Sequence, residues 1–242
     1  MKLKEMTWQE FEEKIKKCDT VVIPSGAFEV YGPQLPLGTD TIVAEEIAIR
    51  VADKLDLIVG PTLEIGDSIA LYDFPGTLNA KPESFKDYLE DICLSFLKWG
   101  IKKFCFINTH LGNVPIIGQL SWKLKYSHKM QSCQIDWWRF IQPICEGITK
   151  FNGYMAHGHA SEAGTSCMLY LRPDLVRQDK LVKNKLLFND NYPDIIKYHE
   201  LHKYTNTGVK GDATVASAEK GKKIVEQGVN RIVAYLKEEF NL

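Results

Sequence analysis

Carboxylate and imidazole side chains gather in three short polar segments of this 242-residue chain. The first segment contains Glu29 and Asp40, the second contains His110, and the third contains His159 and Glu162. These are the ligand types that suit zinc, manganese or iron(II) in proteins. Each residue alone has an ordinary explanation as a solvated loop charge, a helix cap or a loop histidine. Their combination in one chain favours a metal site.

The expected elements place these segments at one edge of a sheet. Thr20–Pro24 has the β-branched, apolar composition of a buried strand, and the first polar segment follows it. Lys103–Ile107 is a second such strand, and His110 comes just after it. Ligand sites in open parallel sheets lie at the carboxyl ends of the strands. We therefore expect Glu29, Asp40 and His110 to converge, and Glu162 to lie beside them.

Hydrophobic periodicity predicts the α/β class, as a three-layer α/β/α sandwich with a mainly parallel central sheet. A capping box at Thr7 opens a short helix. The further expected helices are Asp40–Leu55, Phe85–Trp99, Leu120–Tyr126, Ser166–Leu171 and Ala216–Phe240, and the further strands are Leu57–Val59 and Gln134–Trp138. The long, aperiodic stretch from Gly60 to Pro82 is typical of a functional loop. Residues 1–242 are expected to form a single domain.

Composition excludes several classes of protein. The net charge of -1 gives no broad electrostatic footprint for nucleic acid or for an anionic membrane. The charged N-terminus and the absence of a long apolar run argue against a signal peptide and a membrane span, so we expect a cytoplasmic protein. The six cysteines form no C-x-x-C pair and are expected to be reduced. Cys167 lies close to other candidate site residues in the sequence.

Four motifs in this chain resemble the creatininase family. Ile23–Ala48, IPSGAFEVYGPQLPLGTDTIVAEEIA, is similar to the family run Gly-x-x-Glu-x-His-Gly-Pro-His-Leu-Pro that ends in Thr-Asp. The other motifs, in family order, are Phe74-Pro75-Gly76-Thr77, Asn108-Thr109-His110-Leu111-Gly112-Asn113, and His159-Ala160-Ser161-Glu162 with Thr165-Ser166. Residues 208–221 resemble the C-terminal element of the family. The resemblance spans nearly the whole chain.

The resemblance implies an α/β/α fold, usually assembled as a hexamer, and one or two divalent metals that activate water against a carbon–nitrogen bond. Glu29, Asp40 and His110 fall on metal ligands of the family, and Glu162 falls on a further ligand. His159 matches an active-site histidine that could move a proton or bind substrate.

Three positions depart from the family pattern. Tyr31 replaces a histidine that would bind the second metal, Gln34 replaces another histidine, and Gly164 stands where a glutamate is common. The sequence therefore leaves open whether a second metal ion binds. A neutral phenol is a poor ligand for zinc, whereas its hydroxyl can donate a hydrogen bond to a developing oxyanion.

The leading hypothesis is a metal-dependent hydrolase of a small polar, cyclic substrate, in which metal-activated water attacks a carbonyl. Amide hydrolysis is the first form of the reaction, and carbon–carbon cleavage of a cyclic diketone such as an oxidised inositol, of the 3-dehydro-scyllo-inosose type, is the alternative. A non-catalytic scaffold or binding protein is the second alternative. The catalytic candidates are His159, Tyr31 and Glu162, and the substrate-binding candidates are Gln34, Asn108, Asn113 and Trp138.

Overall fold

Four parallel strands form the central sheet of the protein. The computed structural model describes residues 1–150, 158–184, 195 and 197–242. The strands are β1 (Thr20–Ser25), β2 (Ile58–Val59), β3 (Lys103–Asn108) and β4 (Gln131–Asp136), and their spatial order is β2-β1-β3-β4. All three strand pairings are parallel. The predicted parallel sheet is confirmed.

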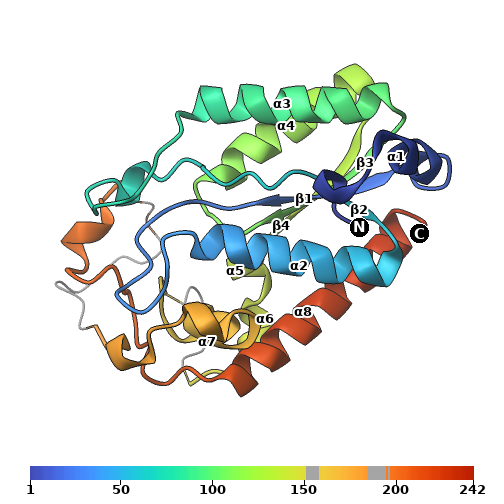
Figure 1. The fold of residues 1–242 in the computed structure, drawn as a ribbon. Helices are drawn as coiled ribbons and strands as arrows, with labels where there is room; N and C mark the ends of the chain where they lie inside the picture. Colours follow the sequence, from blue (N-terminus) through green and yellow to red (C-terminus); the bar gives the residue numbers. More distant parts are fainter. Residues whose placement is uncertain (151–157, 185–194, 196) are drawn as a thin grey trace.

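Helices cover both faces of this sheet (Figure 1). One face carries α2 (Thr39–Leu55), α7 (Glu162–Leu171) and α8 (Ala218–Glu239), and the other carries α1 (Trp8–Ile15), α3 (Pro82–Lys98) and α4 (Asn113–His128). The shorter helices are α5 (Trp137–Phe140), α6 (Gln142–Cys145) and the 3-10 turns Leu3–Glu5, Ile69–Leu71, Pro173–Leu175, Gln178–Lys180 and Leu201–Lys203. This is the predicted α/β/α sandwich.

The strands supply both cores because successive side chains point to opposite faces. On β1, Val22 packs in the core beneath α2 and α8, whereas Val21 and Ile23 pack in the core beneath α3 and α4. Strands β1, β2 and β3 are buried almost throughout, which explains why their sequences are mainly apolar runs rather than alternating ones, whereas the edge strand β4 (QSCQID) is mostly half-buried.

Local sequence signals set the ends of several helices. The predicted capping box at the start of α1 is present, with the Thr7 side chain and the Glu10 side chain each bound to the other's backbone N–H. Helix α2 ends at Leu55 and is followed by Asp56, its C-cap, in the left-handed region. The predicted helix Leu120–Tyr126 lies in the C-terminal half of the longer α4, and the expected helices near residues 85 and 216 are α3 and α8.

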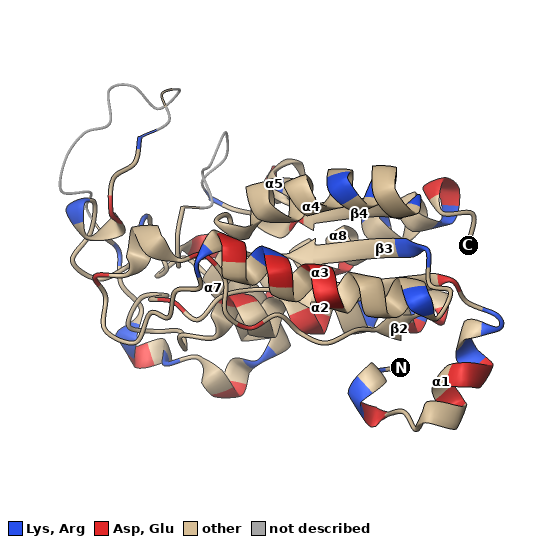
Figure 2. Ribbon diagram, turned by 90° about the horizontal axis from the view of Figure 1, so that it is seen from above, with Lys and Arg blue, Asp and Glu red and all other residues tan. Residues whose placement is uncertain are grey.

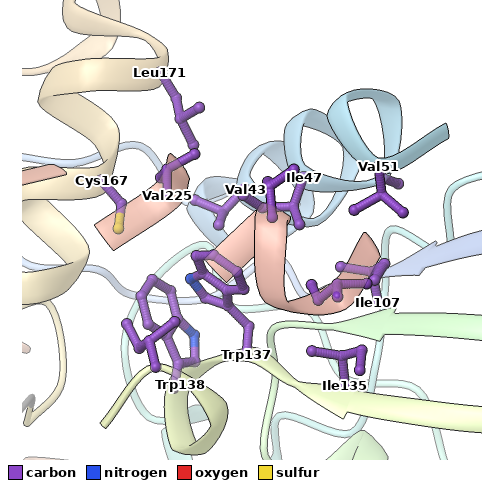
Figure 3. Close-up of a cluster of buried hydrophobic side chains, with 14 of the residues drawn as sticks. Val43, Ile47, Val51, Ile107, Ile135, Trp137, Trp138, Cys167, Leu171 and Val225 are labelled. Carbon is purple, nitrogen blue, oxygen red and sulfur yellow. The ribbon is translucent and has the colours of Figure 1, made fainter. Parts of the chain in front are cut away.

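The predicted strand Gln134–Trp138 is wrong at its C-terminal end. Strand β4 ends at Asp136, and Trp137 and Trp138 form the first turn of α5. The aromatic pair reads as strand because such residues favour strands, but the chain turns there and drives both indoles into the core. Figure 3 shows Trp137 and Trp138 projecting from this turn among buried side chains of α2 and α8.

The carboxyl ends of the strands lie level with one another. Ser25 of β1 pairs in register with Asn108 of β3, which pairs with Asp136 of β4. The segments that follow these residues therefore start at one edge of the sheet, the edge remote from both chain termini in Figure 1. This shared edge brings the polar segments of the sequence together.

Lysine and arginine positions are interspersed with aspartate and glutamate positions along the ribbon in Figure 2. No helix in the described part of the chain is long and apolar enough to cross a membrane. All six cysteines are free thiols, as predicted.

Candidate metal centre

Glu29, Asp40 and His110 form a cluster at the carboxyl edge of the sheet. One potential ligand atom from each lies within 4.8 Å of the other two. The Nδ1 atom of His110 is 2.9 Å from Oε2 of Glu29 and 3.3 Å from Oδ2 of Asp40. None of the three residues is more than 5% exposed. The structure thus brings together the three residues that the sequence predicted as ligands.

Three elements hold these side chains. Glu29 lies in the segment after β1, Asp40 in the first turn of α2, and His110 two residues after β3. The backbone N–H of Thr109 donates to the carbonyl of Ser25, and the Thr109 hydroxyl donates to the carbonyl of Asp40 at 2.7 Å. Thr109 therefore ties the His110 segment to both of the other elements.

The far side of the His110 ring is fixed by a backbone carbonyl. Nε2 lies 2.7 Å from the carbonyl oxygen of Asp67. A carbonyl only accepts, so Nε2 carries a proton, and the lone pair of the neutral ring lies on Nδ1, facing the two carboxylates. This is the arrangement by which proteins orient a histidine ligand.

Trp138 fixes the second oxygen of Asp40. Its indole N–H donates to Oδ1 of Asp40 at 3.2 Å and to the carbonyl of Thr109 at 2.5 Å. The neighbouring Trp137 makes no such contact, although it belongs to the same buried cluster (Figure 3). Trp138 therefore orients Asp40 from the side away from His110.

The charges of the cluster are strongly coupled because all three groups are buried. Burial and the charge of Glu29 raise the pKa of Asp40 to about 7, against the opposing effect of His110. Burial acts to lower the pKa of His110, but Glu29 and Asp40 raise it well above 6.5. Burial likewise acts to raise the pKa of Glu29, and the charge of His110 brings it below 4.5. These pKa shifts indicate that the three-residue cluster favours the binding of a positive charge, either a proton or a cation.

His159 and Tyr31 form the next layer of the site. Nε2 of His159 lies 2.8 Å from the carbonyl of Val30, so Nε2 donates and Nδ1 is left as the acceptor, 3.9 Å from Oε1 of Glu29. Burial lowers the pKa of His159 below 6.5. The Tyr31 ring lies 4.7 Å from the His159 ring, centroid to centroid. Burial and the charge of Asp40 raise the pKa of Tyr31 well above 10, so its hydroxyl keeps its proton.

These groups line a small cavity of about 100 Å³. Its lining residues are Glu29, Tyr31, Asp40, Leu71, Thr109, His110, Leu111, Trp138, Gly158, His159, Ala160 and Gly164. Several of these residues offer polar or ionisable groups to the cavity, whereas Leu71, Leu111 and the Trp138 indole supply apolar surface. Of the predicted substrate-binding residues, only Trp138 reaches this cavity.

The other three predicted substrate-binding residues are buried and bonded to the protein itself. Gln34 donates to the carbonyl of Ala160 at 2.7 Å. Asn108 donates to the carbonyl of His110 at 2.7 Å, and Asn113 donates to the carbonyl of Gly26 at 2.9 Å. None of the three lines the cavity. They shape the loops that carry the site rather than face its interior.

Glu162 also lies outside the cluster. Its carboxylate accepts from the Lys220 ammonium group at 2.6 Å and from the backbone N–H of Lys150 at 2.9 Å. The sequence pattern suggested that Glu162 follows a strand of the sheet. In the structure it is instead the first residue of α7. Its contacts join the N-terminal ends of α7 and α8, and we leave it out of the ligand set proposed below.

Sequence reasoning missed Asp67 and Ser68. The Ser68 hydroxyl donates to Oε2 of Glu29 at 3.2 Å and lies 3.4 Å from Nε2 of His110. Both residues belong to the aperiodic stretch Gly60–Pro82, and the length of that loop was the one signal that pointed to it. Asp67 acts through its carbonyl, which no side-chain pattern reveals.

The donor set fits a divalent metal ion. Two carboxylates and one imidazole converge in a buried space, and within the described part of the chain no lysine or arginine pairs with either carboxylate. Such oxygen and nitrogen donors suit zinc, manganese or iron(II). A bound cation would balance the buried negative charge that the raised pKa of Asp40 reports.

These observations define an α/β/α sandwich with a buried candidate site for a divalent metal at the carboxyl ends of its strands. The family model "Creatininase: Creatinine amidohydrolase" matches residues 4–236. The chain belongs to the creatininase family.

Curated relatives of the chain are hydrolases. It is 28% identical to a 3-dehydro-scyllo-inosose hydrolase of Thermotoga maritima, with 96% of this chain and 79% of that protein covered. It is 28% identical to a creatinine amidohydrolase of Pseudomonas putida, with 98% and 96% covered. A mycofactocin precursor peptide peptidase of Mycolicibacterium smegmatis is also 28% identical, with 87% and 81% covered.

Solved structures agree with this assignment. A structure named "Creatininase Mn" superposes with a TM-score of 0.87 at 25% identity, covering 99% of this chain and 98% of that one. A mutant creatininase of Zn-Zn type superposes with a TM-score of 0.86 at 25% identity, with the same coverage. The fold and the metal-binding character of the family thus match the cluster found in this chain.

Proposed function

We propose that this chain is a metal-dependent hydrolase in which Glu29, Asp40 and His110 hold the metal and the reaction is the attack of water on a carbonyl of a small polar substrate. The convergence of these three side chains on one small cavity, with the acceptor nitrogen of His159 beside them, carries the proposal. When bound, a divalent ion there supplies Lewis-acid polarisation of a carbonyl and lowers the pKa of water.

The residues around the metal ligands have separate tasks in this proposal. His159 accepts a proton at Nδ1, because its Nε2–H is held by the Val30 carbonyl and its lowered pKa keeps the ring neutral. The Tyr31 hydroxyl, protonated in its buried position, donates a hydrogen bond to negative charge that develops on the substrate. Leu71, Leu111 and Trp138 restrict the access of bulk water.

The size of the cavity favours a small substrate over a peptide. A volume of about 100 Å³ is below the 300–1,000 Å³ that is typical of drug-sized ligand pockets. Among the relatives, the creatinine amidohydrolase and the inosose hydrolase have small molecules in their names, whereas the peptidase acts on a precursor peptide. We therefore place the substrate among small cyclic compounds, with a cyclic amide first.

Carbon–carbon cleavage in an oxidised inositol is the second candidate. The relative named 3-dehydro-scyllo-inosose hydrolase is as similar to this chain, at 28% identity, as the creatinine amidohydrolase is. Both reactions need water to attack a polarised carbonyl, so the same ligands would serve. The phenol of Tyr31 suits a hydroxyl-rich substrate, because hydroxyl groups are recognised by hydrogen bonding.

Turnover of metal-reconstituted protein tests the proposal. Chelator-stripped protein is loaded with zinc, manganese or iron(II) and assayed on cyclic amides, lactams and oxidised inositols. We expect turnover only with metal, loss of both metal and turnover in His110→Ala, and a loss of kcat of about 10²–10⁴-fold in His159→Ala with the metal retained.

Two results would contradict this proposal. A His110→Ala variant that kept its metal and its turnover would refute the ligand set. Substoichiometric metal in the gently purified protein, with no gain in stability on adding zinc or manganese, would favour a binding or scaffold protein instead.

Assembly and location stay predictions. The family resemblance predicts a homo-oligomer, a hexamer in the usual form, and composition predicts a cytoplasmic protein that binds no nucleic acid or membrane. Light scattering of the purified chain would give the number of subunits, and cell fractionation would give the location.

A further inference from the structure

The two carboxylate oxygens of Asp40 have different neighbours. Its Oδ2 atom lies 3.3 Å from Nδ1 of His110, inside the cluster. Its Oδ1 atom accepts the indole N–H of Trp138 at 3.2 Å. The Tyr31 ring is only 3% exposed and lies 6.4 Å from the Trp138 ring, centroid to centroid. A bridging carboxylate needs a second metal on one of its oxygens, but here the second oxygen accepts the Trp138 indole N–H.

The Tyr31 ring occupies its position because residue 164 has no side chain. A Cβ atom built on Gly164 would lie 3.3 Å from Cε1 of Tyr31 and 3.7 Å from its hydroxyl oxygen. Contacts of 3.3 Å are tight for a carbon atom, and any longer side chain at this position of α7 would have to displace the phenol. The Tyr31 ring, from the segment after β1, therefore occupies the space that a side chain at position 164 of α7 would need.

Both residues are among those that depart from the family pattern. Tyr31 stands in place of a histidine and Gly164 in place of a glutamate. Their contact in the structure shows that the two changes are spatially coupled, which the sequence could not reveal. One change removes an imidazole and adds bulk, whereas the other removes a carboxylate and makes room for that bulk.

No nearby residue replaces the two missing donors within the described part of the chain. Only one group of at least three potential ligand atoms is found there, namely that of Glu29, Asp40 and His110. The carboxylate of Glu162 is held by Lys220. The Nδ1 atom of His159, 3.9 Å from Oε1 of Glu29, is not part of this group.

We infer that the centre binds a single divalent ion per chain, because the Tyr31–Gly164 contact closes the place of a second ion. This inference rests on the proposed function, since it assumes that the three ligands bind metal. In this inference Tyr31 lines the cavity of a one-metal site and offers its hydroxyl as a hydrogen-bond donor, but is not a metal ligand.

Metal counting on the purified full-length chain tests this inference without an activity assay. Chelator-stripped protein is loaded with excess Mn²⁺, freed of unbound metal, and analysed for metal content and by electron paramagnetic resonance. We expect one Mn²⁺ per chain with the spectrum of an isolated ion. Tyr31→Phe removes the only oxygen of the side chain and should leave the count at one, whereas Tyr31→His/Gly164→Glu should raise it to two.

The outcomes separate this inference from the proposed function. Two Mn²⁺ per wild-type chain, with a spin-coupled spectrum and metal-dependent turnover, would overturn the single-ion inference alone. No bound Mn²⁺ would overturn both proposals. If the double variant does not fold, the wild type and Tyr31→Phe still decide the matter, because a lower metal count in Tyr31→Phe would show that the phenol is a ligand.

Discussion

Replacing Trp138 by phenylalanine should weaken metal binding without touching a ligand. The indole N–H donates to Oδ1 of Asp40 at 3.2 Å, and phenylalanine keeps an aromatic ring but no donor. A hydrogen bond to a charged group contributes about 1.5–3 kcal/mol. Since about 1.4 kcal/mol corresponds to a tenfold change in an equilibrium constant, the metal dissociation constant should rise on the order of 10–100-fold. Loss of an outer hydrogen-bond partner of a metal ligand typically has an effect of this size.

Trp137→Phe is the matched control. Trp137 is adjacent in sequence, fully buried and equal in size, but its indole does not contact Asp40. Its replacement should lower the free energy of unfolding through lost packing and leave the metal dissociation constant nearly unchanged. Competition against a chromophoric chelator measures the constant for both variants. Equal metal affinity in Trp138→Phe and the wild type, or an equal loss in both variants, would refute the reasoning.

Two further predictions concern the loop that holds His110 and the protons of the cluster. A Cβ atom on Gly112 would collide with the carbonyl oxygen of Asp67, which orients His110, whereas one on Gly118 meets nothing within 4 Å. In chemical denaturation we expect Gly112→Ala to cost about 1–3 kcal/mol and to weaken metal binding, and Gly118→Ala to add about 0.5–1 kcal/mol. Metal binding should also release protons: Asp40, with its pKa raised to about 7, is protonated below that pH, and His110, with its pKa raised well above 6.5, keeps its proton to higher pH. Metal affinity should therefore fall as the pH is lowered, by about tenfold per pH unit for each proton displaced, and calorimetry in buffers of different ionisation enthalpy would count these protons. Metal affinity that did not change between pH 6 and pH 8 would contradict the raised pKa of Asp40.

The sequence predicted the sheet and the ligand cluster because both depend on short-range patterns. A buried parallel strand is an apolar run, and the residues after it lie at the carboxyl edge by the geometry of the sheet. Glu29, Asp40 and His110 could therefore be grouped from their positions relative to two strands. This grouping works because register aligns the strand ends at Ser25 and Asn108, and the family resemblance added the assignment of the three residues as ligands.

The direction of a polar side chain was not predictable in the same way. Asn108 and Asn113 lie within two or three residues of His110, yet their amides turn back to bond to the loops. Glu162 follows a histidine motif, yet Lys220, far away in the sequence, pairs with it. Whether a polar group faces a cavity or a backbone carbonyl depends on contacts that only the folded chain defines.

The three proposed metal ligands and the cavity wall differ in how firmly the fold holds them. Glu29, Asp40 and His110 lie directly beside β1, α2 and β3, which are packed through the sheet core. The parts of the wall that would meet the rest of a substrate, such as Leu71 and His159, come from segments outside the sheet. Changes at these wall residues leave the sheet packing intact, whereas Asp67 and Ser68 of the same loop contact His110 and Glu29 directly. This arrangement explains how relatives named for different substrates can share one fold, and it directs the search for specificity in this chain to residues 69–80 and to the turn at Gly158–Ala160.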